Sequence, residues 1–139
     1  MTRRCAVLPI LALAMGLLPG EVRASAETLP PIPQVIACSG NEPFWSLEID
    51  GAIGRYNALG ADGIERWPDT IGERSELNYL AKPALVWRGR PADADRDMVA
   101  FAYAEACVDT MADGPANPIT LILSLPGGRT VQGCCAHAL

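Results

Sequence analysis

Hydrophobic and polar residues alternate most clearly from Phe44 to Asp50. Trp45, Leu47 and Ile49 occupy alternate positions, with polar residues between them. Because successive side chains of a strand point to opposite faces, this pattern predicts a half-buried β-strand with these three residues inside. By the same parity, Phe44 falls on the face that meets solvent.

Further short apolar runs follow, each bounded by glycine, proline or aspartate. The run 98–106 is rich in alanine, but Val99, Phe101 and Tyr103 recur with a period of two, which favours a strand over a helix. The polar segment 69–76 carries no pattern that assigns it to an element. The expected strands after the first are 55–59, 64–67, 77–80, 84–88, 98–106, 119–125 and 129–135.

This succession of short strands predicts an all-β domain. Pro126-Gly127-Gly128 separates two apolar runs and predicts a tight hairpin. No helical periodicity and no internal repeat competes with the strand pattern. We therefore expect a small antiparallel β-barrel or sandwich of about seven or eight strands.

The N-terminal region has the features of a secretory signal peptide. Arg3 and Arg4 precede an apolar stretch from Cys5 to Leu18, and Ala24-Ser25-Ala26 offers a small-residue cleavage site. We expect a signal over 1–26, an extended proline-rich leader over 27–37 and a single domain over 38–139, located in the periplasm or secreted, with no membrane span after cleavage. An uncleaved signal that serves as an anchor is the alternative.

The charge of the expected mature chain restricts its partners. The whole sequence holds 11 Lys and Arg and 16 Asp and Glu. Removing Arg3, Arg4, Arg23 and Glu21 with the signal leaves eight basic and 15 acidic residues, a net charge of −7. Such a chain lacks the basic surface that nucleic acids require. The acidic charge is compatible with a cationic partner, and equally with a role in solubility alone.

Four cysteines remain after the signal is removed, namely Cys38, Cys107, Cys134 and Cys135. An even number of cysteines in an exported chain predicts disulfides, because that compartment oxidises thiols. Zinc is disfavoured, since the adjacent pair lacks the spacing that lets two thiolates bind one tetrahedral ion.

The parity of the last strand favours one disulfide pairing. If Val131 faces the core, Cys135 faces it too, whereas Cys134 faces outward. Cys135 would then point toward the end of the strand that carries Val99, Phe101 and Tyr103, which also leads to Cys107. We therefore expect disulfides Cys107–Cys135 and Cys38–Cys134.

Two segments stand out together: 38–49, which runs Cys-Ser-Gly-Asn-Glu-Pro-Phe-Trp-Ser-Leu-Glu-Ile, and Cys107-Val108-Asp109-Thr110-Met111 with a later Gly133-Cys134-Cys135. They resemble a family of uncharacterised bacterial envelope proteins that open on C-x-G-x-E-P-F-W, continue with C-x-D-x-M and close on G-C-C. The resemblance implies a location in the cell envelope and no particular chemistry. Ala112 and Asn117 depart from the residues usual in that family.

Candidate functional residues lie in the same two segments. Glu42, Pro43 and Phe44 place a carboxylate beside an outward aromatic ring, a combination typical of recognition surfaces, and Asp109 is expected nearby. The only histidine, His137, stands near the C-terminus, where it is poorly suited to serve as a catalytic base. The acidic loop at 93–97 lacks the full calcium-binding pattern. We predict no catalytic residues, metal or cofactor.

Two function classes fit these observations. The first is a non-enzymatic binding or accessory protein of the envelope, whose partner is an envelope protein, a cell-wall enzyme that it inhibits or a small ligand. The second is an enzyme acting on an envelope polymer through Glu42 and Asp109, because paired carboxylates can perform acid–base chemistry without histidine.

Overall fold

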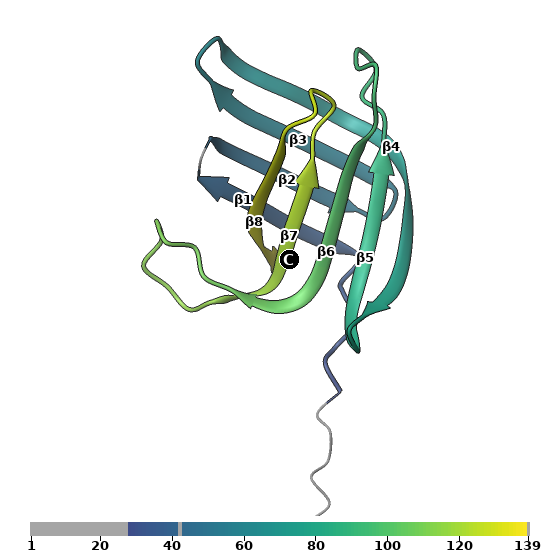
Figure 1. Ribbon diagram of the computed structural model, residues 1–139, viewed down its shortest axis with the longest axis vertical. Helices are drawn as coiled ribbons and strands as arrows, with labels where there is room; N and C mark the ends of the chain where they lie inside the picture. The colour runs from purple at the N-terminus through teal and green to yellow at the C-terminus, as the bar shows by residue number, and fades with distance from the viewer. Residues whose placement is uncertain (1–27, 42, 139) are drawn as a thin grey trace, which may run out of the picture.

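The computed structural model describes residues 28–41 and 43–138, so the expected signal peptide and Glu42 lie outside the described residues. The described chain forms a closed barrel in which each strand pairs antiparallel with the next and β8 pairs with β1 (Figure 1). The predicted all-β class is confirmed, and of the two expected architectures the barrel is the one found. The strands are β1 (Val35–Asn41), β2 (Phe44–Asp50), β3 (Ile53–Gly60), β4 (Gly63–Tyr79), β5 (Lys82–Gly89), β6 (Met98–Cys107), β7 (Asn117–Ser124) and β8 (Thr130–His137).

The predicted faces of β2 are confirmed. Trp45, Leu47 and Ile49 are buried in the barrel interior, whereas Phe44 lies on the outer surface. The predicted hairpin between β7 and β8 is also present, closed by a hydrogen bond from the Leu125 amide to the Arg129 carbonyl. Local alternation and turn residues therefore specified these elements correctly.

The Trp87 ring lies in the barrel interior and packs against three strand positions that are occupied by glycine. A methyl group added at Gly54, Gly72 or Gly89 would lie 2.6–2.7 Å from an atom of the Trp87 ring, far inside van der Waals contact. The Trp87 indole also donates a hydrogen bond of 3.0 Å to the Ala52 carbonyl. The interior of an eight-stranded barrel is just wide enough for side chains to fill it. The Trp87 indole therefore fits inside the barrel only because these three positions lack a side chain.

The strand β6 turns its smaller apolar side chains toward the interior. Met98, Ala100 and Ala102 point inward and are fully buried, while Phe101 and Tyr103 lie on the outer surface. Ala100 pairs with Trp87 across the β5–β6 ladder. Because the tryptophan occupies the interior at this level, its neighbour on the inner face has to be small.

Two strands extend beyond the expected ranges. β1 begins at Val35, within the stretch 27–37 that we expected to be an extended leader, and its residues alternate between buried and exposed. β4 runs through the unassigned segment 69–76 and past Pro68. Asp69 has a φ of 40°, and the β3–β4 register shifts between Gly54 and Tyr56, so a local irregularity lets one long strand bend around the barrel.

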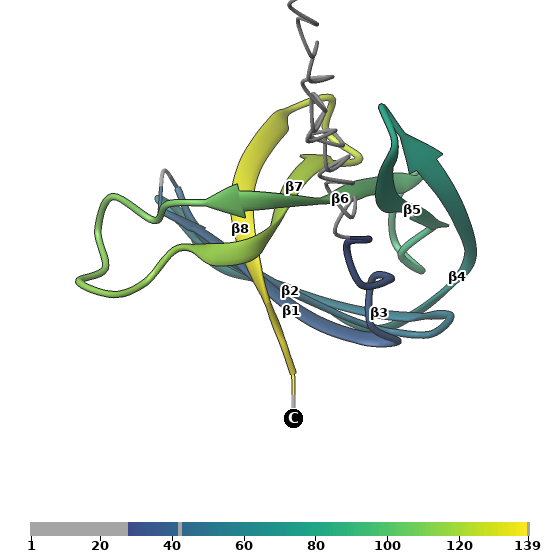
Figure 2. The ribbon, with the colours of Figure 1, turned by 90° about the horizontal axis from the view of Figure 1, so that it is seen from below.

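The segment before β1 covers the lower end of the barrel (Figure 2). Ile32 is only 5% exposed and belongs to the core. The Arg74 guanidinium donates hydrogen bonds to the carbonyls of Ile32, Pro33 and Gln34, at 3.2, 2.9 and 2.8 Å. One side chain thus fixes three consecutive peptide groups across the opening.

The four cysteines form two disulfides, but the expected pairing was wrong. The bonds are Cys38–Cys135 and Cys107–Cys134. The expected parity of β8 holds, since Cys135 is fully buried on the inner side. However, Cys38 stands on an inner position of the unexpected strand β1, directly opposite Cys135 in the register. Cys107 follows an irregularity in β6 and reaches Cys134 instead.

A substitution at Gly133 tests the importance of the glycine walls. A methyl group there would overlap the Ser39 carbonyl and the Trp45 ring. We expect Gly133→Ala to lower the free energy of unfolding by at least about 2 kcal/mol, measured by chemical denaturation. Gly127→Ala is the matched control, because nothing lies within 4 Å of an added methyl group in its turn. Equal stability of the two variants would contradict the packing argument.

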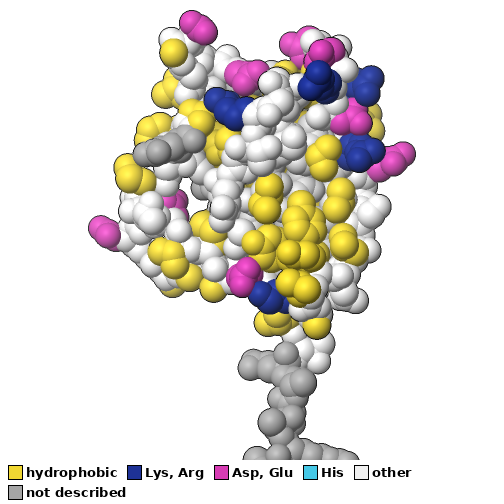
Figure 3. Space-filling model, in the orientation of Figure 1, with side chains coloured by type: hydrophobic (Ala, Val, Ile, Leu, Met, Phe, Trp, Pro, Cys, Tyr) yellow, Lys and Arg dark blue, Asp and Glu magenta, His cyan; other side chains and the backbone are white. Residues whose placement is uncertain are grey.

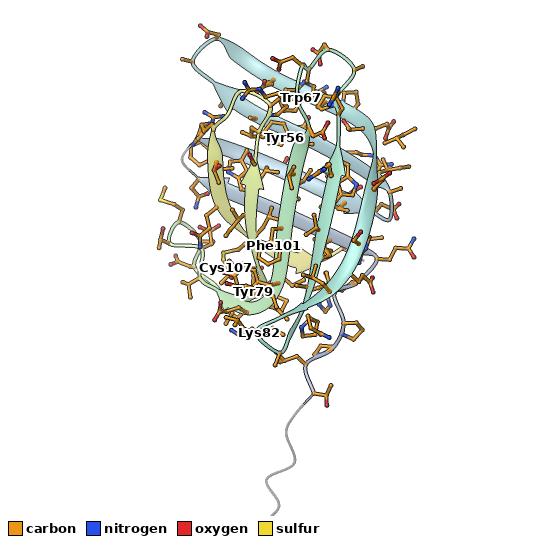
Figure 4. The ribbon with its side chains drawn as sticks, turned by 45° about the vertical axis from the view of Figure 1, so that its right-hand side comes forward. Tyr56, Trp67, Tyr79, Lys82, Phe101 and Cys107 are labelled. Carbon is orange, nitrogen blue, oxygen red and sulfur yellow. A yellow bond between two sulfur atoms is a disulfide. The ribbon has the colours of Figure 1, made fainter. Side chains whose placement is uncertain are left out.

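Tyr56 provides a second test of the interior. Its ring is fully buried and stacks on Trp67 with centroids 5.1 Å apart (Figure 4), and its hydroxyl has no hydrogen-bond partner among the described residues. Burial, with a smaller contribution from the nearby Glu65 charge, raises the pKa of Tyr56 above its ordinary value of 10.0, while Arg129 acts in the opposite direction.

We expect Tyr56→Phe to be as stable as the wild type near neutral pH, or more stable by about 1 kcal/mol, because it removes an unpaired buried hydroxyl. Above pH 10 the unfolded tyrosine ionises before the folded one, so the wild type should lose stability that the variant keeps. Denaturation curves between pH 7 and 11, the range flanking this pKa, check both effects. A variant that is less stable throughout would show that the hydroxyl has a stabilising contact.

Candidate functional site

Three connections project from the same side of the barrel, on the left of Figure 1: the β1–β2 turn, the tip of the β3–β4 hairpin and the segment 108–116 between β6 and β7. Five large apolar side chains on or beside them are exposed. We call these five residues the loop edge. They are Phe44, Leu59, Ile64, Val108 and Met111, with exposed fractions of 56, 58, 66, 70 and 69%.

Two hollows lie beside these three connections. The first, of about 570 Å³, lies along Phe44, Leu59 and Ile64 and has Arg66 among its lining residues. The second, of about 300 Å³, lies beside the Cys107–Cys134 disulfide and Asp109. Both are lined by Ser39, Gly40 and Asn41, so the two hollows adjoin at the end of β1, and we refer to them together as the groove. The left side of the space-filling view is correspondingly hollowed (Figure 3).

Phe44 occupies the outward position that its parity predicted. It is the first residue of β2 and pairs with Asn41 across the β1–β2 turn. Pro43 lies in that turn and is partly exposed. Glu42, the remaining candidate of this motif, lies outside the described residues.

Asp109 contacts the opening motif, although the Cys38–Cys134 bond from which its proximity was expected does not form. Its Oδ1 accepts hydrogen bonds from the Asn41 Nδ2 and from the Met111 amide, the latter at 2.9 Å. The Cys107–Cys134 disulfide holds the start of the same connection on β8. The two motifs singled out in the sequence are therefore in direct contact, although 68 positions separate Asn41 from Asp109.

Sequence reasoning missed most of the apolar residues of this surface. Leu59 and Ile64 pair with each other next to the Gly60–Gly63 turn, where a hairpin that extends from the barrel has no core beneath it. Two large apolar residues flanking a turn were a usable signal. Val108 and Met111 are separated by two polar residues in a connection without regular structure, and nothing in their pattern distinguished them.

A separate aromatic cluster lies on the outer wall over β4 to β6. Tyr79 makes edge contacts with Phe101 and Tyr103, with ring centroids 5.2 and 5.5 Å apart (Figure 4). The Lys82–Glu105 ion pair, at 2.7 Å, connects the neighbouring strands β5 and β6. Phe101 and Tyr103 also stack on each other, with ring centroids 5.4 Å apart, so the three rings pack together across strands.

The acidic loop 93–97 and His137, which the sequence also singled out, do not line the groove. Asp97 of the acidic loop pairs with Arg90 at 2.8 Å. His137 is exposed at the end of β8. Over 28–41 and 43–138, no three side chains of His, Cys, Asp or Glu gather as metal ligands, and no helix has the length and apolar character to cross a membrane.

Two adjacent substitutions separate surface from core. Phe44→Ala should change the free energy of unfolding by less than about 1 kcal/mol, because the ring is mostly solvated. Trp45→Ala should cost about 3 to 5 kcal/mol, because it empties the barrel interior. Thermal or chemical denaturation of both variants gives the comparison. A large loss for Phe44→Ala would mean that this ring is part of the structural core.

Comparisons with protein-family models, with curated proteins and with solved structures found no significant match to this chain. The envelope family suggested by the two motifs therefore stays an expectation from those residues.

Proposed function

We propose that this protein is an exported binding protein of the bacterial envelope and that the loop edge is its recognition surface. The observation that carries the proposal is the grouping, from three connections, of five exposed apolar side chains, four of which line the two adjoining hollows. Exposed apolar patches with a polar surround are typical of interaction sites. The two disulfides are consistent with an oxidising compartment.

The construction of the surface also supports binding. The Cys107–Cys134 bond and the contact between Asn41 and Asp109 hold the start of the 108–116 connection. The β1–β2 turn is anchored by Trp45, which is buried directly behind Phe44. A surface held in place before contact loses less conformational entropy on association.

Site-directed cross-linking tests this proposal in the native cell. A photoreactive benzoylphenylalanine at position 44 should give a discrete cross-linked product on irradiation. The same residue at position 71 is the matched control, since Ile71 is also an outward residue and is 80% exposed.

A product that forms from position 44 and is absent from position 71 is the expected result. Identical products from both positions, or none from position 44 in correctly exported protein, would overturn the proposal. Mass spectrometry of the product identifies the partner.

A further inference from the structure

We infer that the partner presents a cationic side chain to Asp109, carried by a protein segment whose apolar neighbours cover the loop edge. This inference rests on the proposed function and specifies the chemistry of the partner. It starts from the two oxygens of the Asp109 carboxylate, which have different surroundings.

Oδ1 of Asp109 is engaged within the protein by Asn41 and Met111. Oδ2 receives no hydrogen bond from the described part of the chain, although the residue is partly buried and lines the smaller hollow of the groove. A carboxylate oxygen in such a place is a strong acceptor, and its preferred donors are guanidinium and ammonium groups.

The barrel provides no cation at this position. Within the described residues, the ion-paired cations stand on other walls: Arg55 with Glu48 and Asp69, Arg74 with Glu76, Lys82 with Glu105, and Arg88 and Arg90 with Asp97. The cation that lines the groove, Arg66, borders the other hollow and donates to the Asn57 amide oxygen at 3.0 Å.

The acidic residues of the neighbouring connections also favour a cationic partner. Asp113 stands on the same connection as Asp109, and Asp62 stands at the tip of the β3–β4 hairpin. Neither belongs to an ion pair in the described part of the chain. An edge with exposed carboxylates and large apolar side chains is complementary to a segment that is both basic and apolar, because long cationic side chains pack their methylene stems on apolar surface.

A protein segment fits this site better than a small amine. The apolar residues of the loop edge come from three connections and extend beyond the hollow that holds Asp109, so a single amine would leave most of them in water. The groups that this surface offers are the apolar side chains of the loop edge and the Asp109 carboxylate, so we expect recognition through side chains.

Asp109→Asn isolates the charge. An asparagine keeps an Oδ1 that can accept from Asn41 and Met111, so the connection should stay folded while the negative charge is lost. Asp50→Asn, on the outer face of β2, removes the same charge away from the groove and is the control. The probes are two blocked tripeptides, acetyl-Leu-Arg-Leu-amide and its citrulline counterpart, which replaces the guanidinium by a neutral group of similar shape.

Titrations followed by nuclear magnetic resonance measure the affinity of each probe. For wild type and Asp50→Asn, the arginine peptide should shift the amide signals of Asn41, Asp109 and Met111 and bind about tenfold more tightly than the citrulline peptide. For Asp109→Asn the two peptides should bind alike. Equal binding of both peptides to the wild type, or signal shifts centred elsewhere, would overturn the inference. The same holds if acetyl-arginine-amide, which lacks the two leucines, binds as tightly as the arginine tripeptide.

The two proposals can fail separately. If the wild type shows no preference for the arginine peptide but position 44 still gives a specific cross-link, the cationic partner is rejected and the binding function is retained. Absence of cross-linking from position 44 would reject the binding function itself.

Discussion

The structure depends on fitting two indole rings into the interior of a narrow barrel. Trp87 packs against Gly54, Gly72 and Gly89, and Trp45 packs against Gly40 and Gly133. Each ring needs a wall without side chains, because an eight-stranded barrel encloses only enough space for its own inward residues. The inward alanines of β6 follow from the same limit. With the indoles inside, the aromatic residues of β6 are left on the outer wall.

The position of the candidate site follows from this packing. Gly40 lies in β1 and Gly133 in β8, so the Trp45 ring lies against the two strands whose pairing closes the barrel. The Cys38–Cys135 bond joins the same two strands and closes a long loop of the chain, with a sequence separation of 97. A cross-link of this span restricts the unfolded chain strongly, by about 4.7 kcal/mol for a loop of about 100 residues in the chain-entropy model. The end of β1 is thereby fixed, and both hollows of the groove share it.

The distribution of charge separates the walls from the groove. Ion pairs such as Arg55 with Glu48 join neighbouring strands of the wall, where exposed pairs contribute little to stability. Asp109 instead has one oxygen bonded within the fold and one without a bond from the described residues. This arrangement combines a fixed geometry with an acceptor that is available to a partner.

The sequence by itself determined the features that depend on a single strand or on composition. The alternation in Phe44–Asp50 predicted the inward Trp45 and the outward Phe44, and an even number of cysteines in a chain expected to be exported predicted disulfides. Only the tertiary structure decided which face of β6 is inside, because both of its faces are apolar and the size of the interior makes the choice. It also decided the disulfide pairs and the contact of Asn41 with Asp109, since β1 and β8 become neighbours only when the barrel closes, and no local pattern records which residues that closure brings together.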